Sequence, residues 1–212
     1  MSEPDRKQLE DGLAALGIAG GEDLAGRLLD FVGLLSKWNR VYNLTAVRDP
    51  AKMVPLHLLD SLSVHPWLRG GRVVDVGTGA GLPGIPLALC DASRHFTLLD
   101  TNGKKTRFVT HAVGALGLGS VEVVQSRAED YAPAEPFDTV VCRAYAPLAR
   151  IVATSGHLCA KGGSIVAMKG ARPDEELAEL AEQAPDWRVD EVQRIVVPGL
   201  DSERHLVRLV KA

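Results

Sequence analysis

The chain has 212 residues, a net charge of −3 and 46% hydrophobic residues, which is ordinary for a globular protein. This length can bury a full hydrophobic core and fits one domain over 1–212. No apolar run approaches about 18 residues, so no membrane span is predicted, and the polar N-terminal stretch does not resemble a signal peptide. The three cysteines form no C-x-x-C pair, which argues against a zinc cage or a disulfide framework and favours a reducing, cytoplasmic location.

Charge is unevenly distributed along the chain. Residues 37–72 hold six bases and two acids, and residues 139–173 hold five bases and no acid. Residues 1–36 and 174–203 are acidic, with seven and ten carboxylates respectively. A local basic patch can bind phosphates while the acidic remainder limits nonspecific binding. The alternative is chance clustering of bases on a solvated surface.

The first part of the chain, residues 1–68, is predicted to form a helical cap. The helical spacing of apolar residues predicts helices over 5–16 and 22–40. Asp49-Pro50 predicts the start of a third helix, with Asp as the N-cap and Pro at the first helical position. That helix is expected to extend to about Val64.

From Arg72 onward, strand and helix patterns alternate, which predicts an α/β core over 69–212. Strands are predicted over 72–76, 95–99, 120–125, 137–142, 163–168, 188–197 and 203–210. Helices are predicted over 84–90, 103–117, 146–158 and 174–183. No helix-length segment separates the last two strands, so they are expected to form an antiparallel hairpin. Five β/α units closed by this hairpin predict a mostly parallel, seven-stranded sheet.

A glycine-rich stretch follows the first predicted strand and predicts a nucleotide pocket. Gly77, Gly79 and Gly81 alternate along this stretch, and glycine permits positive φ and the close approach of a ligand. Pro83 suits the first turn of the helix that follows. Strand, glycine turn and helix are the layout of a nucleotide pocket at the carboxyl edge of a doubly wound sheet. A plain tight turn is the alternative.

Polar residues end the next three predicted strands. Asp100 ends the second strand, where a carboxylate can accept both ribose hydroxyls of a nucleoside. Residues 125–130 follow the third strand and offer polar groups to an adenine edge, although Glu129 and Asp130 could instead lie on an exposed helix. Arg143 ends the fourth strand, and we expect it to face the same crevice.

Two nucleotide ligands fit this pattern. Gly79 to Gly84 matches G-x-G-x-x-G, and Asp100 lies near the expected distance of about 20 residues, which favours NAD and an oxidoreductase. S-adenosylmethionine is the other candidate, because its pocket uses the same geometry without a pyrophosphate. The C-terminal hairpin, Pro83 in the turn and the absence of a Tyr-x-x-x-Lys dyad favour S-adenosylmethionine. A regulatory nucleotide-binding module without catalytic activity is a further alternative.

Absent motifs narrow the methyl acceptor. After the fourth strand the chain has Arg143-Ala144-Tyr145-Ala146, and not the Asp/Asn-Pro-Pro-aromatic tetrapeptide of exocyclic-amine methyltransferases. Cys142 lies near the place of the thiolate in pyrimidine-C5 enzymes, but it lacks the usual preceding Pro, so a core role is favoured. Acceptors that are already nucleophilic, such as a guanine N7, remain among the candidates.

The sequence resembles the ribosomal RNA small subunit methyltransferase G family, also called glucose-inhibited division protein B. The resemblance covers roughly residues 31–210, and its most specific stretches are Asn43-Leu44-Thr45 and Asp75 to Gly84. It implies a Rossmann-like, S-adenosylmethionine-dependent fold and methyl transfer to N7 of a guanine in the decoding-region loop of 16S rRNA. The substrate would be the rRNA or the small ribosomal subunit. The family usually has Arg where this chain has Leu56, so the role of that arginine would fall to Arg40 or Arg48.

The pattern and the resemblance together give a set of expected site residues. Contacts to S-adenosylmethionine are expected from Gly77, Gly79, Leu82, Asp100, Ala128, Glu129 and Arg143. Contacts to RNA are expected from Arg40, Asn43, His57, Lys169 and Arg204, of which Arg40, Lys169 and Arg204 should flank the pocket and meet phosphates. Arg143 and Lys169 are positioning candidates, and no residue is assigned as a catalytic acid or base. No metal site is expected, and a monomer is expected.

Overall fold

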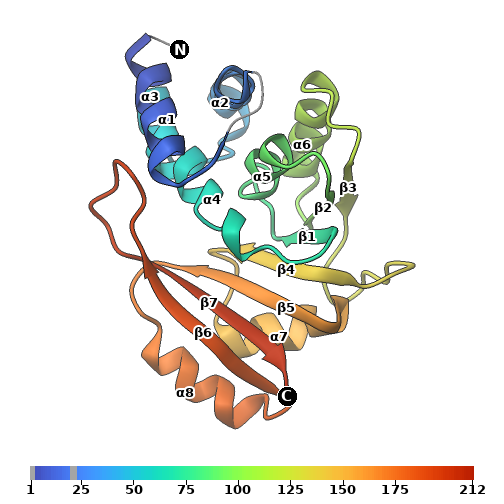
Figure 1. The fold of residues 1–212 in the computed structure, drawn as a ribbon. Coiled ribbons are helices and arrows are strands. Elements are labelled where there is room, and N and C mark those ends of the chain that lie inside the picture. Colours follow the sequence, from blue (N-terminus) through green and yellow to red (C-terminus); the bar gives the residue numbers. More distant parts are fainter. Residues whose placement is uncertain (1–2, 20–22) are drawn as a thin grey trace.

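The structure, a computed structural model, describes residues 3–19 and 23–212. Seven strands form one sheet in the order β3-β2-β1-β4-β5-β7-β6 (Figure 1). Strand β7 is antiparallel to β5 and β6, and the other pairs are parallel, which confirms the predicted sheet. The strands are β1 Arg72–Val76, β2 His95–Asp100, β3 Val121–Gln125, β4 Phe137–Arg143, β5 Cys159–Lys169, β6 Trp187–Ile195 and β7 Arg204–Lys211.

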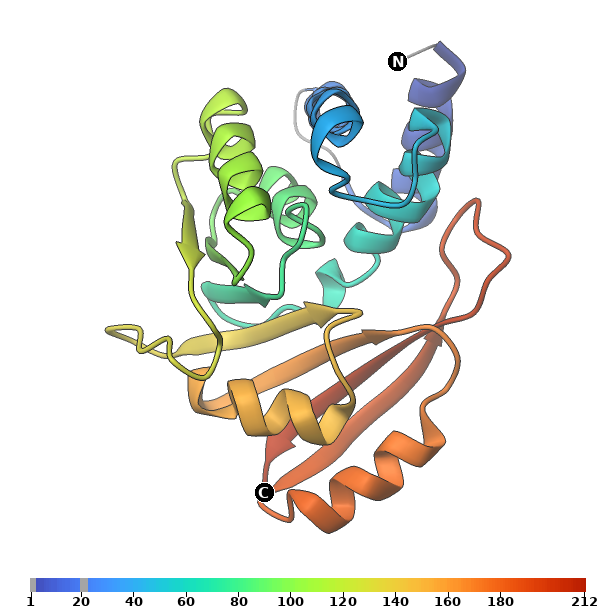
Figure 2. The same cartoon turned by 180° about the vertical axis from the view of Figure 1, so that it is seen from behind.

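Helices precede the sheet and cover both of its faces. The N-terminal segment and helices α5 and α6 lie on one face, and α7 and α8 lie on the other (Figures 1 and 2). Residues 126–136, between β3 and β4, contain no helix. The structure therefore has four β/α units and not the expected five. The longer helices are α1 Glu3–Ala15, α2 Leu24–Tyr42, α5 Gly84–Cys90, α6 Gly103–Ala115, α7 Leu148–Ser155 and α8 Asp174–Gln183. The predicted start of the second helix, residue 22, lies outside the described residues.

The segment that follows Asp49 differs from the single helix predicted there. The Asp49 side chain caps helix α3 Pro50–Met53 by accepting from the Ala51 N–H at 3.1 Å. A π-helical stretch, Val54–Leu59, then leads into α4 Asp60–Leu62, and a short 3₁₀ turn, His65–Trp67, precedes β1. Such wide turns occur mostly as insertions in helices and often lie at functional sites.

Neighbouring residues along each strand point to opposite faces of the sheet, as the pleat requires. Val73 and Val141 belong to a hydrophobic cluster with α1, α2, α5 and α6, whereas Val74 and Val140 pack with α7 and α8. The N-terminal helices therefore share a core with one face of the sheet. The division of a single domain into a cap over 1–68 and a core over 69–212 stays a prediction. Within the described residues, no helix is long and apolar enough to cross a membrane.

Candidate functional site

The turn after β1 is built by glycines and by a buried carboxylate. Gly77 and Gly79 have φ values of 69° and 60°, a left-handed region that side chains disfavour. The Asp75 Oδ2 accepts hydrogen bonds from the Thr78 hydroxyl at 2.6 Å and the Gly84 N–H at 2.9 Å. One carboxylate of β1 thus holds both the turn and the start of α5.

Asp75 itself is fully enclosed. Burial raises the pKa of its carboxyl to about 6, although the Thr78 hydroxyl and the Gly84 N–H favour the charged form. Its Oδ1 has no hydrogen-bond partner, which fits a carboxyl group that holds a proton easily. Because no solvent reaches it, Asp75 supports the turn and does not face a substrate.

Two hollows adjoin at the carboxyl ends of the central strands. The first has a volume of about 440 Å³ and the second about 240 Å³. Gly77, Lys105 and Ala144 line both hollows. A Cβ on Gly77 would lie 2.6 Å from the Tyr145 ring, so only glycine leaves room at the point where the hollows meet.

The second hollow contains the residues expected to hold a nucleoside. Asp100, Ala128 and Glu129 all line it. The Asp100 Oδ2 accepts from the Gly79 N–H at 2.9 Å, and its Oδ1 accepts from the Asn102 N–H at 2.8 Å. Each carboxylate oxygen can accept a second hydrogen bond, so Asp100 is fixed by the backbone and still able to bind hydroxyl groups. This geometry fits the ribose of S-adenosylmethionine.

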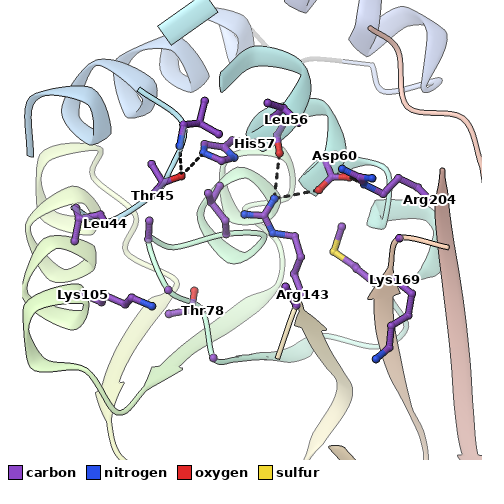
Figure 3. Close-up of a pocket in the computed structure, with 18 residues that line it drawn as sticks. Leu44, Thr45, Leu56, His57, Asp60, Thr78, Lys105, Arg143, Lys169 and Arg204 are labelled. Carbon is purple, nitrogen blue, oxygen red and sulfur yellow. Dashed lines mark hydrogen bonds and ion pairs between the residues drawn. The ribbon is translucent and has the colours of Figure 1, made fainter. Parts of the chain in front are cut away.

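The first hollow brings together most of the other expected residues (Figure 3). The expected residues that line it are Gly77, Gly79, Leu82, His57, Arg143, Lys169 and Arg204. His57 Nε2 lies 2.9 Å from the Thr45 hydroxyl, and Nδ1 is buried without a hydrogen-bond partner. Burial and the nearby Arg143 charge lower the pKa of His57, so this ring is neutral at pH 7.

A buried carboxylate joins two arginines beside this hollow, and we call Asp60, Arg143 and Arg204 the arginine clasp. The Asp60 Oδ2 accepts from Arg143 Nη1 at 3.0 Å, and its Oδ1 accepts from Arg204 Nε at 2.7 Å. The Asp60 side chain is only 5% exposed. Arg143 also donates to the Leu56 carbonyl at 3.2 Å, so the backbone of Leu56 contributes to the site whatever its side chain. The sequence pattern predicts no role for Asp60.

Lys169 lines the first hollow, but its ammonium group is engaged elsewhere. Its Nζ donates to Glu176 at 2.7 Å and to the Ala146 carbonyl at 2.8 Å, and Figure 3 shows the side chain extending away from the clasp. Arg204, the other expected phosphate contact in this hollow, is paired with Asp60. Both cations would have to share or exchange their partners in order to meet RNA phosphates.

Arg40 and Asn43 line neither hollow, and the expectation that Arg40 flanks the pocket stays a prediction. Arg40 lines a separate hollow with Lys37 and Asp49 on the other side of α2. Asn43 ends α2 with a φ of 49° and accepts a long hydrogen bond, 3.4 Å, from Arg48. Their expected contacts to RNA stay predictions.

Lys105 lies in the site but was not among the residues expected from the sequence. It lies in the first turn of α6, directly after β2, and lines both hollows. The available signal was its place three residues after the Asn102 N-cap, since side chains there point toward the carboxyl edge of a parallel sheet. No group of His, Cys, Asp and Glu suited to a metal ion occurs among residues 3–19 and 23–212.

The sheet order and the pocket beside Asp100 define the fold of S-adenosylmethionine-dependent methyltransferases. A solved glycopeptide N-methyltransferase complexed with S-adenosyl-L-homocysteine superimposes with a TM-score of 0.62 over 74% of this chain and 87% of that one. The two are 13% identical, so this likeness concerns the fold. The family itself follows from sequence comparison.

The family model for rRNA small subunit methyltransferase G matches residues 25–207. The ribosomal RNA small subunit methyltransferase G of Methylococcus capsulatus is 52% identical, over 95% of this chain and 96% of its own. That of Marinobacter nauticus is 48% identical, over 97% and 94% respectively. The chain belongs to the rRNA small subunit methyltransferase G family, which confirms the resemblance.

Proposed function

We propose that the protein transfers a methyl group from S-adenosylmethionine to N7 of a guanine in the decoding-region loop of 16S rRNA. One observation carries this proposal. The second hollow contains Asp100, a carboxylate that the backbone anchors, and it meets the first hollow, which cations line, at Gly77. Membership of the rRNA small subunit methyltransferase G family supports the substrate class. When bound, S-adenosylmethionine supplies an electrophilic methyl group on a sulfonium.

Binding and orientation are the tasks left to the side chains. Asp100 would accept the ribose hydroxyls in the second hollow, and the first hollow would receive the guanine. The guanine must leave its stack to enter, as is usual for enzymes that act on a base. Arg143, held by Asp60 and Leu56, must not bind guanine in the common bidentate manner through O6 and N7, because N7 is the atom that attacks. Arg143 is therefore a positioning group for the donor, a phosphate or O6.

No general base is needed, and neither His57 nor Asp75 is free to act as one. Guanine N7 attacks with a lone pair and carries no proton, so the rate enhancement comes from proximity and orientation. His57 is bonded to the Thr45 hydroxyl, and Asp75 is enclosed. Burial raises the pKa of the Cys142 thiol to about 12, so no thiolate nucleophile forms near neutral pH. This site suits an acceptor that is already nucleophilic.

The decisive experiment is transfer of labelled methyl from S-adenosylmethionine to free rRNA, assembly intermediates and finished small subunits, with the modified base mapped. We expect 7-methylguanine at one position in at least one of these substrates. Single-turnover rates at saturating donor and RNA should be flat between about pH 6 and 9, since acid–base catalysis would give a titration. A rate that falls tenfold per pH unit below a clear pKa would show removal of a proton and exclude guanine N7.

The donor site can be tested separately from the acceptor. Asp100→Ala should weaken S-adenosylmethionine binding by about 1.5–3 kcal/mol, the range for hydrogen bonds to a charged group. Asp130→Ala, which removes a nearby exposed carboxylate, should leave this affinity unchanged. Calorimetry that gives equal affinities for both variants, or tighter binding of NAD, would contradict the assignment. The antiparallel β7 between β5 and β6 already differs from the sheet order 3-2-1-4-5-6 of dinucleotide-binding domains.

A further inference from the structure

The C-terminal end of α2 packs beside α6, where the Trp38 and Phe108 ring centroids lie 5.6 Å apart. Figures 1 and 2 show both helices on the same side of the sheet. The Trp38 ring lies 5.3 Å from the Tyr42 ring and 5.1 Å from the His111 ring, measured between centroids. Only three large hydrophobic side chains are exposed in the described part of the chain, and two of them are adjacent here: Val41 at 70% and Tyr42 at 39%. A partly exposed aromatic ring such as that of Tyr42 can serve as a stacking platform for a nucleic-acid base.

The part of this surface that α6 forms is basic. Residues 101–121, which form α6 and the adjoining loops, hold three Lys and Arg and no Asp or Glu. Lys104, Arg107 and His111 are all exposed and share one side of α6, because positions three, four and seven apart lie on one helical face. Neither Lys104 nor Arg107 forms an ion pair with any described residue.

Residues next to this surface in the chain line the first hollow. Lys105, the neighbour of Lys104, lines that hollow, and so does Leu44, two residues after Tyr42. Arg143 and Arg204 differ from these α6 cations, since both are held by Asp60. The cations at this hollow that have no ion-pair partner among the described residues therefore include Lys105 and its neighbours on α6.

We propose that this basic-aromatic face, formed by Trp38, Val41, Tyr42, Lys104, Arg107 and His111, binds a single-stranded segment of the rRNA that adjoins the target guanine. One base would stack on Tyr42, and Lys104 and Arg107 would bind backbone phosphates. Single strands are recognised by this combination of an aromatic platform and a basic groove, whereas a duplex keeps its bases stacked inside. The inference rests on the proposed rRNA methyl transfer and names the surface that holds the substrate.

The test measures binding of a fluorescein-labelled, 12-nucleotide single-stranded RNA of mixed sequence by anisotropy, with S-adenosylhomocysteine present. Tyr42→Ala should weaken binding about 5- to 150-fold, the range found when a base loses its stacking partner, while Tyr42→Phe should bind like the parent. Lys104→Ala/Arg107→Ala should reduce the slope of log affinity against log salt by about 1.4, since each lost phosphate contact on a single strand removes about 0.7. A hairpin duplex of the same length should bind more weakly than the single strand.

The matched control is Lys161→Ala/Arg188→Ala, which removes two exposed cations near the amino-terminal ends of β5 and β6 and should keep the parent salt slope. Methyl transfer to rRNA by the parent protein is measured in parallel. If transfer occurs while Tyr42→Ala and the Lys104/Arg107 variant bind RNA like the parent, this inference is wrong and the proposed function stands. If no transfer occurs but the face still binds the single strand, the proposed function fails alone. Equal binding of the duplex, or self-association that Tyr42→Ala abolishes in sedimentation, would overturn the inference in favour of another occupant.

Discussion

The arginine clasp makes Asp60 the side chain whose loss should have the widest effect. Asp60 accepts from two guanidinium groups at 2.7 and 3.0 Å and is 5% exposed, whereas the Arg143 and Arg204 side chains are 20% and 21% exposed. A hydrogen bond to a charged group contributes about 1.5–3 kcal/mol. In Asp60→Asn one oxygen remains as an acceptor. The amide N–H₂ faces the second arginine, and no hydrogen bond forms between them because both groups are donors.

We expect Asp60→Asn to lower the free energy of unfolding by about 2–3 kcal/mol. This value lies near the lower end of the destabilisation found when one partner of a buried ion pair is removed. The loss of stability is not larger because both arginines keep other acceptors. Arg143 donates to the Leu56 carbonyl, and Arg204 donates to the Ser202 hydroxyl and the Glu203 carbonyl. Methyl transfer should fall roughly 10- to 100-fold, since small displacements of positioning groups have effects of this size. Urea unfolding with linear extrapolation and single-turnover rates measure the two effects.

The control is Asp11→Asn, which breaks an exposed ion pair with Lys7 within α1 and should change stability by less than about 0.5 kcal/mol. Asp60→Asn combined with Arg204→Met should be less destabilising than the sum of the single variants, because the two side chains share one interaction. A loss below about 1 kcal/mol in Asp60→Asn, or strict additivity in the double variant, would refute the clasp as a source of stability.

Three further predictions concern the turn and the core. Gly77→Ala should lower the unfolding free energy by about 1–3 kcal/mol through backbone strain and the clash with Tyr145, whereas Gly33→Ala, in the open on α2, should raise it by about 0.5–1 kcal/mol. The raised pKa of Asp75 means that the folded state binds this proton more tightly than the unfolded state. Unfolding free energy should therefore fall by about 2 kcal/mol as pH rises from about 4 to about 6. Urea titrations of Asp75→Asn at each pH should lack this fall. Cys142→Ala should retain methyl transfer in the labelled-donor assay, and an inactive but folded variant would revive the thiolate alternative.

Local signals explain why the centre of the fold could be predicted from the sequence. The bounds of β1 and α5 agree with the predicted 72–76 and 84–90, because a buried strand, alternating glycines and a proline each act within a few residues. The C-terminal hairpin followed similarly from a Pro-Gly turn between two β-rich segments. The wide turn at Val54–Leu59 could not be seen, since the apolar spacing there also fits an ordinary helix and tertiary packing decides between them.

Contacts between distant residues account for most of what the sequence analysis missed. Asp60 meets Arg143 and Arg204, which lie 83 and 144 positions further along the chain, and no local pattern encodes such a meeting. The carboxyl edge of the sheet did predict that Asp100 and Arg143 would be near Gly77, because parallel strands end together. It could not predict which cations would be neutralised by partners. Lys169 and Arg204 therefore looked like free phosphate contacts, although Glu176 and Asp60 already bind them.

Charge neutralisation gives the arginine clasp a role beyond geometry. The proposed donor is a sulfonium cation, and methylation of guanine N7 leaves a positive charge on the acceptor. A bare guanidinium about 5 Å from either group would raise its energy by about 3 kcal/mol at an effective dielectric constant of 20. Asp60 offsets part of this repulsion, because its one negative charge faces the two positive charges of Arg143 and Arg204, and Glu176 offsets that of Lys169. The guanidinium groups keep N–H donors for positioning. A carboxylate at Asp60 should therefore matter for donor affinity as well as for stability, and a neutral side chain of the same shape should lower both.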